Sequence, residues 1–191
     1  MPTPDYRNID PATVYPRALQ AMRNPGFLKS PRYQEQQTRA NRVGAHPHIL
    51  EFSDKLVKRG AALGIPLFAH CIVRTFDEQA AAFVLGHSKD HPDDGLWPHR
   101  CAAVDIIHGT LGWMDQPNIP HAWDVIGHLG HEVARSMDIK ITWGGDWDGD
   151  GDTMDNRLYD PAHFELSNWR QIAISGDKYW SPHGASGTVE R

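Results

Sequence analysis

The sequence predicts a single α+β domain with a small central antiparallel sheet flanked by helices. Its 191 residues are enough for one well-packed core and few for two. Short apolar runs between turn residues predict strands, and longer stretches with apolar residues at helical spacing predict helices. These elements follow one another without a regular strand–helix–strand repeat, which favours an antiparallel sheet.

Three segments are expected along the chain. Residues 1–45 are rich in Pro, Arg, Asn and Gln and predict an N-terminal extension packed on the domain, with one short helix around residues 15–22. Residues 46–175 carry the regular pattern of apolar residues and form the main domain. Residues 176–191 are rich in Gly, Ser and Pro and are expected to form a loose tail.

Within the main domain, a first helix is expected over residues 49–63, because its apolar positions recur at helical spacing and a glycine follows. A short helix is expected over residues 77–84, and a longer one begins at Pro120 and carries an apolar stripe. A polar loop over residues 86–98 and an acidic loop over residues 144–156 separate these elements. The expected strands are LFAHCIV, CAAVDII, IKITW and HFEL.

Composition excludes several classes of function. The net charge of −5 gives no electrostatic support for binding nucleic acid, and no run approaches the ~20 apolar residues of a membrane-spanning helix. The N-terminal residues MPTPDYRNIDP lack a basic start followed by an apolar stretch, so we expect a protein made in the cytoplasm without a signal peptide. Cys71 and Cys101 lie in apolar contexts and are expected to be buried free thiols.

Three segments, PHRCAAVDII, WGGDW and DPAHFEL, contain the residues of a candidate zinc site. A catalytic zinc ion takes three His or carboxylate ligands, keeps one position open, and needs a carboxylate nearby as general base. His99, Asp105 and His163 would be the ligands, and Asp160, three residues before His163, would be the base. Asp105 lies in an apolar strand, where a carboxylate is costly unless it is paired or bound to metal.

Together with IVRTFDEQAAAFVLG, these segments resemble, in order, the zinc peptidases that include D-alanyl-D-alanine carboxypeptidases and phage L-alanyl-D-glutamate endopeptidases, relatives of the hedgehog fold. The resemblance extends from about Ile65 to Leu166. It implies a catalytic domain over residues 46–175, one zinc cofactor, and hydrolysis of peptide bonds in bacterial peptidoglycan. It also implies that Arg74 stabilises the oxyanion, and we expect Glu165 to orient a ligand.

The first ligand departs from the family pattern. Five residues separate His99 from Asp105, where the family has six, and the Ser before and the Gly after that His are missing. At ~3.3 Å per residue, an extended segment would hold the two side chains too far apart to share a metal, so this segment must bend. We predict His99 as the first ligand because it lies nearest to the Asp105 strand; His91, His87 and His108 are the alternatives.

The acidic loop resembles the start of a calcium-binding loop. Asp146, Asp148 and Asp150 followed by glycine spell D-x-D-x-D-G, and Asp152 adds another carboxylate. Arg157 stands where such a loop would have its bidentate Glu. Clustered carboxylates repel one another without a cation, so we expect calcium here; a solvated loop of Asx turns is the alternative.

The sequence therefore predicts a monomeric zinc peptidase with a peptidoglycan peptide as partner and with neither nucleic acid nor a membrane as partner. Endopeptidase and carboxypeptidase activity both stay open. We expect a phage or prophage endolysin that acts on the cell wall, in the periplasm, after release from the cytoplasm. Two alternatives remain: a non-catalytic metal-binding member of the same fold, against which Arg74 and Asp160 argue, and a calcium-binding interaction protein.

Overall fold

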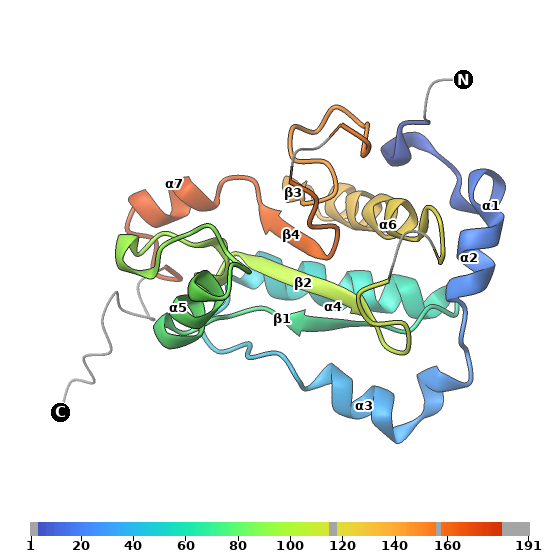
Figure 1. Ribbon diagram of the computed structural model, residues 1–191, viewed down its shortest axis with the longest axis horizontal. Helices are drawn as coiled ribbons and strands as arrows, with labels where there is room; N and C mark the ends of the chain where they lie inside the picture. Colours follow the sequence, from blue (N-terminus) through green and yellow to red (C-terminus); the bar gives the residue numbers. More distant parts are fainter. Residues whose placement is uncertain (1–3, 115–117, 156–157, 181–191) are drawn as a thin grey trace.

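The computed structural model describes residues 4–114, 118–155 and 158–180 and has the predicted α+β fold (Figure 1). Within these ranges, seven α-helices surround one four-stranded sheet of order β1-β2-β4-β3, and every neighbouring pair of strands is antiparallel. The strands are β1 (Leu67–Cys71), β2 (Ala103–His108), β3 (Ile141–Trp143) and β4 (His163–Leu166).

The two longest helices cover one face of the sheet. Helix α4 (Pro47–Ala62) packs against β1, β2 and α6 (Ala122–Ser136), and α6 also contacts β3. In Figure 1 both helices lie behind the sheet, whereas α5 (Phe76–Val84) and α7 (Trp169–Ile174) lie near the end where β2 begins. The opposite face of the central strands is therefore free to carry polar side chains.

Successive side chains along a strand point to opposite faces of the sheet, so that apolar and polar residues are separated. Phe164 of β4 is fully buried and packs on Phe52 of α4, with ring centroids 5.5 Å apart. Its neighbours His163 and Glu165 must then point to the other face, because successive side chains of a strand alternate. Asp105 of β2 pairs directly with His163, so these two side chains share that face.

The N-terminal segment contains more helix than the sequence predicted. Besides α2 (Pro16–Met22), it forms α1 (Pro11–Val14) and α3 (Pro31–Gln37), together with the 3-10 helices η1 (Tyr6–Asn8) and η2 (Phe27–Lys29). Each of these helices has seven residues or fewer, which is too short for a clear apolar periodicity. The segment contributes core residues, among them Tyr6, Met22 and Tyr33.

The strands and the described end of the C-terminal segment differ in detail from the sequence expectation. Strands β1, β2 and β3 are shorter than their apolar runs, which continue into turns. Trp180, in the segment expected to form a loose tail, is buried and stacks on Trp169 with ring centroids 5.8 Å apart; residues 181–191 lie outside the described residues. No helix in the described ranges has the length and apolar character needed to cross a lipid bilayer.

Candidate metal centre

Three ligand atoms from separate segments form a nearly equilateral triangle on the polar face of the sheet. Asp105 Oδ1 lies 3.0 Å from His99 Nε2 and 3.1 Å from His163 Nδ1, and the two nitrogens are 3.2 Å apart. All three residues are at most 5% exposed. Atoms bound tetrahedrally to zinc at ~2.0–2.1 Å would be about 3.3 Å apart. The donor set and its spacing therefore fit one zinc ion.

The backbone explains how His99 reaches this triangle. Residues Pro98–Arg100 form the 3-10 helix η4, which supplies the bend that the short spacing to Asp105 requires. The Ala102 N–H donates to the Pro98 carbonyl at 2.8 Å, and the Arg74 N–H donates to the His99 carbonyl at 2.8 Å. These bonds anchor the turn beside the sheet.

The outer nitrogen of each histidine is held by an acceptor. His99 Nδ1 donates to the Ile72 carbonyl oxygen at 3.0 Å, and His163 Nε2 donates to Glu165 Oε2 at 3.0 Å. Glu165 is itself fixed, because its Oε1 accepts from Trp169 Nε1 at 2.9 Å. Holding the N–H on the outer side leaves Nε2 of His99 and Nδ1 of His163 as the atoms that face the centre.

Charge in the triangle favours a cation. Burial would lower the pKa of His99, but the Asp105 carboxylate raises it to about 10. Burial also opposes the charged form of His163, yet hydrogen bonds to Asp105 and Glu165 raise its pKa. Burial would raise the pKa of Asp105, and the two histidines bring it well below its usual range. A positive charge, from protons or from a metal, is thus required beside Asp105.

Arg74 joins this cluster from the loop before α5. Its Nη2 donates to Asp105 Oδ2 at 3.3 Å, and its Nη1 lies 3.5 Å from Gln79 Oε1. Gln79 is fully buried, and its Nε2 also donates to Ser88 Oγ and to the Asp90 carbonyl, both at 2.8 Å. Gln79, which lies in the segment IVRTFDEQAAAFVLG that carries the family resemblance, therefore ties Arg74 to the polar loop that follows α5.

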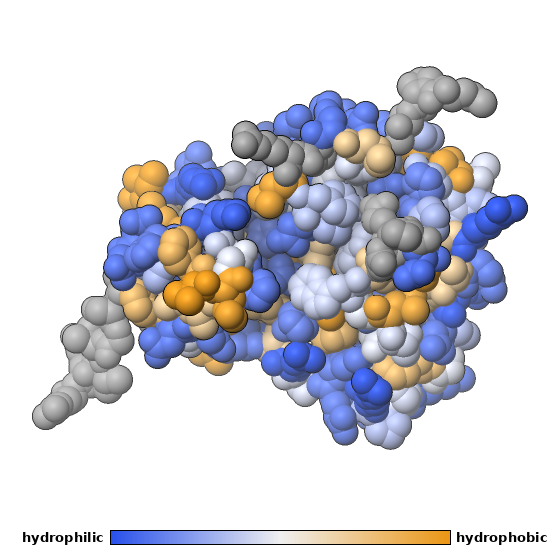
Figure 2. All heavy atoms as spheres, viewed as in Figure 1, coloured by the Kyte–Doolittle hydropathy of each residue, from blue (hydrophilic) through white to orange (hydrophobic). Residues whose placement is uncertain are grey.

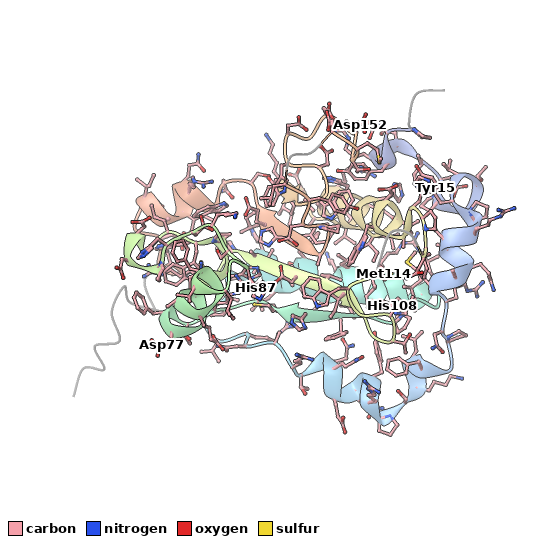
Figure 3. The ribbon with its side chains drawn as sticks, viewed as in Figure 1. Tyr15, Asp77, His87, His108, Met114 and Asp152 are labelled. Carbon is pink, nitrogen blue, oxygen red and sulfur yellow. The ribbon has the colours of Figure 1, made fainter. Side chains whose placement is uncertain are left out.

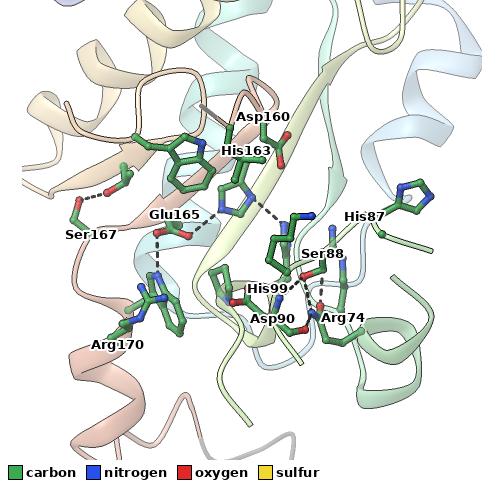
Figure 4. Close-up of a pocket in the computed structure, with 18 of the residues that line it drawn as sticks. Arg74, His87, Ser88, Asp90, His99, Asp160, His163, Glu165, Ser167 and Arg170 are labelled. Carbon is green, nitrogen blue, oxygen red and sulfur yellow. Dashed lines mark hydrogen bonds and ion pairs between the residues drawn. The ribbon is translucent and has the colours of Figure 1, made fainter. Parts of the chain in front are cut away.

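Asp160 lies on the same wall of the cleft as His163 (Figure 4). Main-chain bonds close its turn: the His163 N–H donates to the Asp160 carbonyl at 3.0 Å, and the Asp160 N–H donates to the Gly144 carbonyl at 2.8 Å. A Cβ at Gly144 would collide with the Asp160 carbonyl oxygen, which explains one glycine of WGGDW. In the described structure no hydrogen bond ties the Asp160 carboxylate to this turn, so that carboxylate faces the cleft.

The surroundings of Asp160 favour its protonated form. Burial raises the pKa of its carboxyl, nearby His163 lowers it, and the charge of Asp105 raises it again, with a net upward shift. A carboxyl group with a raised pKa and no partner in its own turn is a suitable proton acceptor and donor.

Two hollows meet at this cluster, and the space-filling view shows the face hollowed among hydrophilic residues (Figure 2). One hollow of about 550 Å³ is lined by His99, His163 and Arg170, and the other, of about 720 Å³, by Asp105 and Trp113. Arg74, His87 and Asp160 line both hollows. Together they form a cleft of the size that small ligands and peptide segments occupy, with the triangle at its middle.

The alternative first ligands lie elsewhere. His87 lines the cleft but takes no part in the triangle, and His91 caps η3 (Pro92–Asp94) by accepting the Asp93 N–H at 3.2 Å. His108 donates to the Met22 carbonyl at 2.8 Å, and Figure 3 shows it far along the sheet from His87. Of the four candidates, the structure brings only His99 to Asp105 and His163.

A second group could also hold a metal. Cys71, His99 and Asp105 offer ligand atoms within 4.8 Å of one another, and Cys71 Sγ lies 3.6 Å from His99 Nδ1. Cys71 is opposite Asp105 in the sheet, which explains this proximity. Both thiols are free, as expected, and Cys101 is buried, but Cys71 is only half-buried at the cleft, where the expected burial is wrong.

The acidic loop contains close carboxylates and also a protein cation. Asp146, Asp148 and Asp150 have oxygens within 4.8 Å of one another. Arg7 donates to the carbonyl oxygens of Gly149 and Asp150 in the same loop. Arg7 is itself paired with Asp5, so these bonds tie the loop to the N-terminal segment, a contact that the sequence alone did not predict.

Hydrogen bonds of the Asx-turn type shape this loop. Such bonds are also expected if the loop is solvated and binds no calcium. Asp146 is buried and accepts the N–H groups of Gly149 and Gly151 at 2.9 and 3.0 Å. Asp150 accepts the Asp152 N–H at 2.8 Å. Calcium binding here therefore stays a prediction.

Calcium at millimolar concentration is expected to raise the melting temperature of metal-stripped protein, because an ion that binds only the folded loop stabilises it by linkage. Asp148→Asn combined with Asp150→Asn should abolish the shift, since it removes two carboxylates of the cluster. Differential scanning calorimetry with and without calcium measures the effect. An unchanged melting temperature for the parent protein would leave the solvated loop as the correct interpretation.

Comparison with known proteins adds information on the fold. No family model and no curated protein matches the sequence. The structure is similar to the crystal structure of the L-Ala D-Glu endopeptidase ChiX from Serratia marcescens, with a TM-score of 0.53 and 19% sequence identity. The similarity covers 74% of this chain and 90% of that chain. At this identity the likeness shows the fold alone: the chain has the fold of an L-Ala D-Glu endopeptidase.

Proposed function

We propose that this chain is a zinc-dependent peptidase that cuts peptide bonds in the stem peptides of bacterial peptidoglycan. The observation that carries the proposal is the triangle of His99, Asp105 and His163, in which both histidines have their outer nitrogen held by an acceptor. Its place between two hollows gives a substrate access from both sides. The fold of an L-Ala D-Glu endopeptidase supports the substrate class.

In the proposed reaction, His99, Asp105 and His163 hold the metal. When bound, zinc supplies Lewis acidity, which lowers the pKa of a water molecule toward ~7 and polarises a carbonyl oxygen. Asp160 accepts a proton as the water oxygen attacks the scissile carbonyl carbon. Asp160 then returns the proton to the amide nitrogen as the C–N bond breaks, which leaves a carboxylic acid and an amine.

Two other side chains support this reaction. Arg74 donates hydrogen bonds to the oxyanion, from a position fixed by Asp105 and Gln79. Glu165 keeps the His163 ring in one orientation and tautomer. Such an activity would serve a phage or prophage endolysin that opens the cell wall. The direct test is the release of new peptide ends from purified peptidoglycan by zinc-loaded protein.

Zinc affinity of the metal-stripped protein is expected to rise with pH. Asp105 raises the pKa of His99 to about 10, so that protons compete with the metal for the ligand nitrogens at neutral pH. Each zinc ion bound near pH 7 should release about one proton or more. Calorimetric titration in two buffers with different ionisation enthalpies counts these protons. Binding without proton release would contradict the assignment of His99 as a ligand.

A further inference from the structure

Arg170 presents a free cationic group to the hollow that contains His99 and His163. Its guanidinium carbon lies 4.2 Å from the centroid of the Trp169 ring. Among the described residues no carboxylate forms an ion pair with it. Asp90 lines the same hollow, and burial raises the pKa of its carboxyl, a shift that the charge of Arg170 opposes. An exposed arginine beside a reaction centre without an acidic partner is available to an anionic ligand.

A chain of contacts fixes Arg170 relative to the metal centre. Trp169 is buried, and its Nε1 donates to Glu165, which in turn accepts from His163. Figure 4 shows this series running from His163 through Glu165 to Arg170. Stacking on a ring that is itself held in place restricts the guanidinium, so less side-chain entropy is lost when a ligand binds.

A second cation lines the same hollow. Lys89 belongs to the loop after α5, and hydrogen bonds from Gln79 to Ser88 and Asp90 hold that loop on both sides of Lys89. Glu165, which also lines the hollow, is already bonded to His163 and Trp169. Glu165 is therefore not available to either basic group, and in the described structure Asp90 forms no ion pair with them.

We propose that Arg170, assisted by Lys89, binds a free carboxylate of the substrate next to the bond that is cut. The inference rests on the proposed function and names the group by which this site selects its substrate. Arginine suits the task because its planar fork binds both carboxylate oxygens. A stem peptide offers two such groups: the α-carboxylate of a γ-linked D-glutamate, and the C-terminal carboxylate of D-alanine.

The test uses the zinc-loaded full chain and four synthetic peptides. One pair contains an L-Ala–γ-D-Glu bond with the glutamate α-group as carboxylate or as carboxamide, and the other ends in D-Ala–D-Ala with a free or an amidated terminus. The parent should cut one carboxylate peptide with a kcat/KM about 10- to 100-fold above that of its carboxamide, the range expected for a charged hydrogen-bonded pair. The pair that shows this preference identifies the source of the carboxylate.

Arg170→Gln should remove this preference by lowering kcat/KM for the carboxylate peptide alone, and Arg170→Lys should retain part of it. Arg32→Gln is the matched control, because Arg32 is exposed on α3 and lines neither hollow. An equal loss on carboxylate and carboxamide in Arg170→Gln, or no preference in the parent, would overturn the inference while the peptidase activity stands. If the parent cuts none of the four peptides, the proposed function fails as well.

Discussion

Asp160→Asn is expected to lower kcat by about 10²–10⁴-fold while the bound zinc and the melting temperature stay unchanged. The substitution keeps the shape of the side chain and removes its basicity. Asp160 lines both hollows, and main-chain bonds rather than its carboxylate close the turn before His163. Its loss should therefore affect proton transfer and spare the fold.

Zinc content, melting temperature and cleavage of peptidoglycan are measured on the same variant. Asp94→Asn serves as the control, since Asp94 is an exposed carboxylate at the end of η3 and lines neither hollow. A fall in melting temperature with activity retained would show that Asp160 only stabilises its turn. Cleavage within a few-fold of the parent, with zinc bound, would transfer the role of base to Glu165.

His163→Ala is expected to abolish stoichiometric zinc binding and, with it, activity. The substitution removes one corner of the triangle, whose three atoms lie 3.0–3.2 Å apart. Loss of a group that only orients a ligand costs ~10–100-fold in affinity, so loss of a ligand should cost more. Elemental analysis after dialysis against a weak chelator measures the effect.

Companion variants decide between the two possible ligand sets. His99→Ala should lose zinc like His163→Ala, whereas His87→Ala should keep it, because His87 lies on the cleft wall outside the triangle. Cys71→Ala should also keep zinc. If Cys71→Ala loses the metal and His163→Ala retains it, the group of Cys71, His99 and Asp105 is the metal site instead.

Most of the central fold could be predicted from the sequence, because its elements are long enough to show their periodicity. Helices α4 and α6 and strands β2 and β4 lie where the apolar pattern placed them. The helices of the first 45 residues were mostly missed, since a helix such as α1 has four residues and derives its stability from packing on the domain.

For the candidate site, the sequence predicted the residues but not the strand pairing that brings them together. The sequence indicated His99, Asp105 and His163, and the structure brings them together, but strand register cannot be read from a sequence without knowing which strands pair. The pairing of Asp105 with His163 on one side and with Cys71 on the other is therefore new information. Gln79 lies in the segment that resembles the family, but its role in holding Arg74 was not predicted, because a polar residue in a short helix usually faces solvent, whereas this one is fully buried.

Mass spectrometry of purified peptidoglycan after digestion would show directly whether the protein cuts peptidoglycan peptides and whether it needs zinc to do so. Three preparations are compared: the zinc-loaded protein, the protein stripped by a chelator, and the stripped protein with zinc restored. We expect new peptide ends at one bond that involves a D-amino acid, present in the first and third digests and absent from the second. Intact peptidoglycan in all three digests, with one zinc bound per chain in the first, would contradict this expectation and identify a non-catalytic metal-binding protein of this fold.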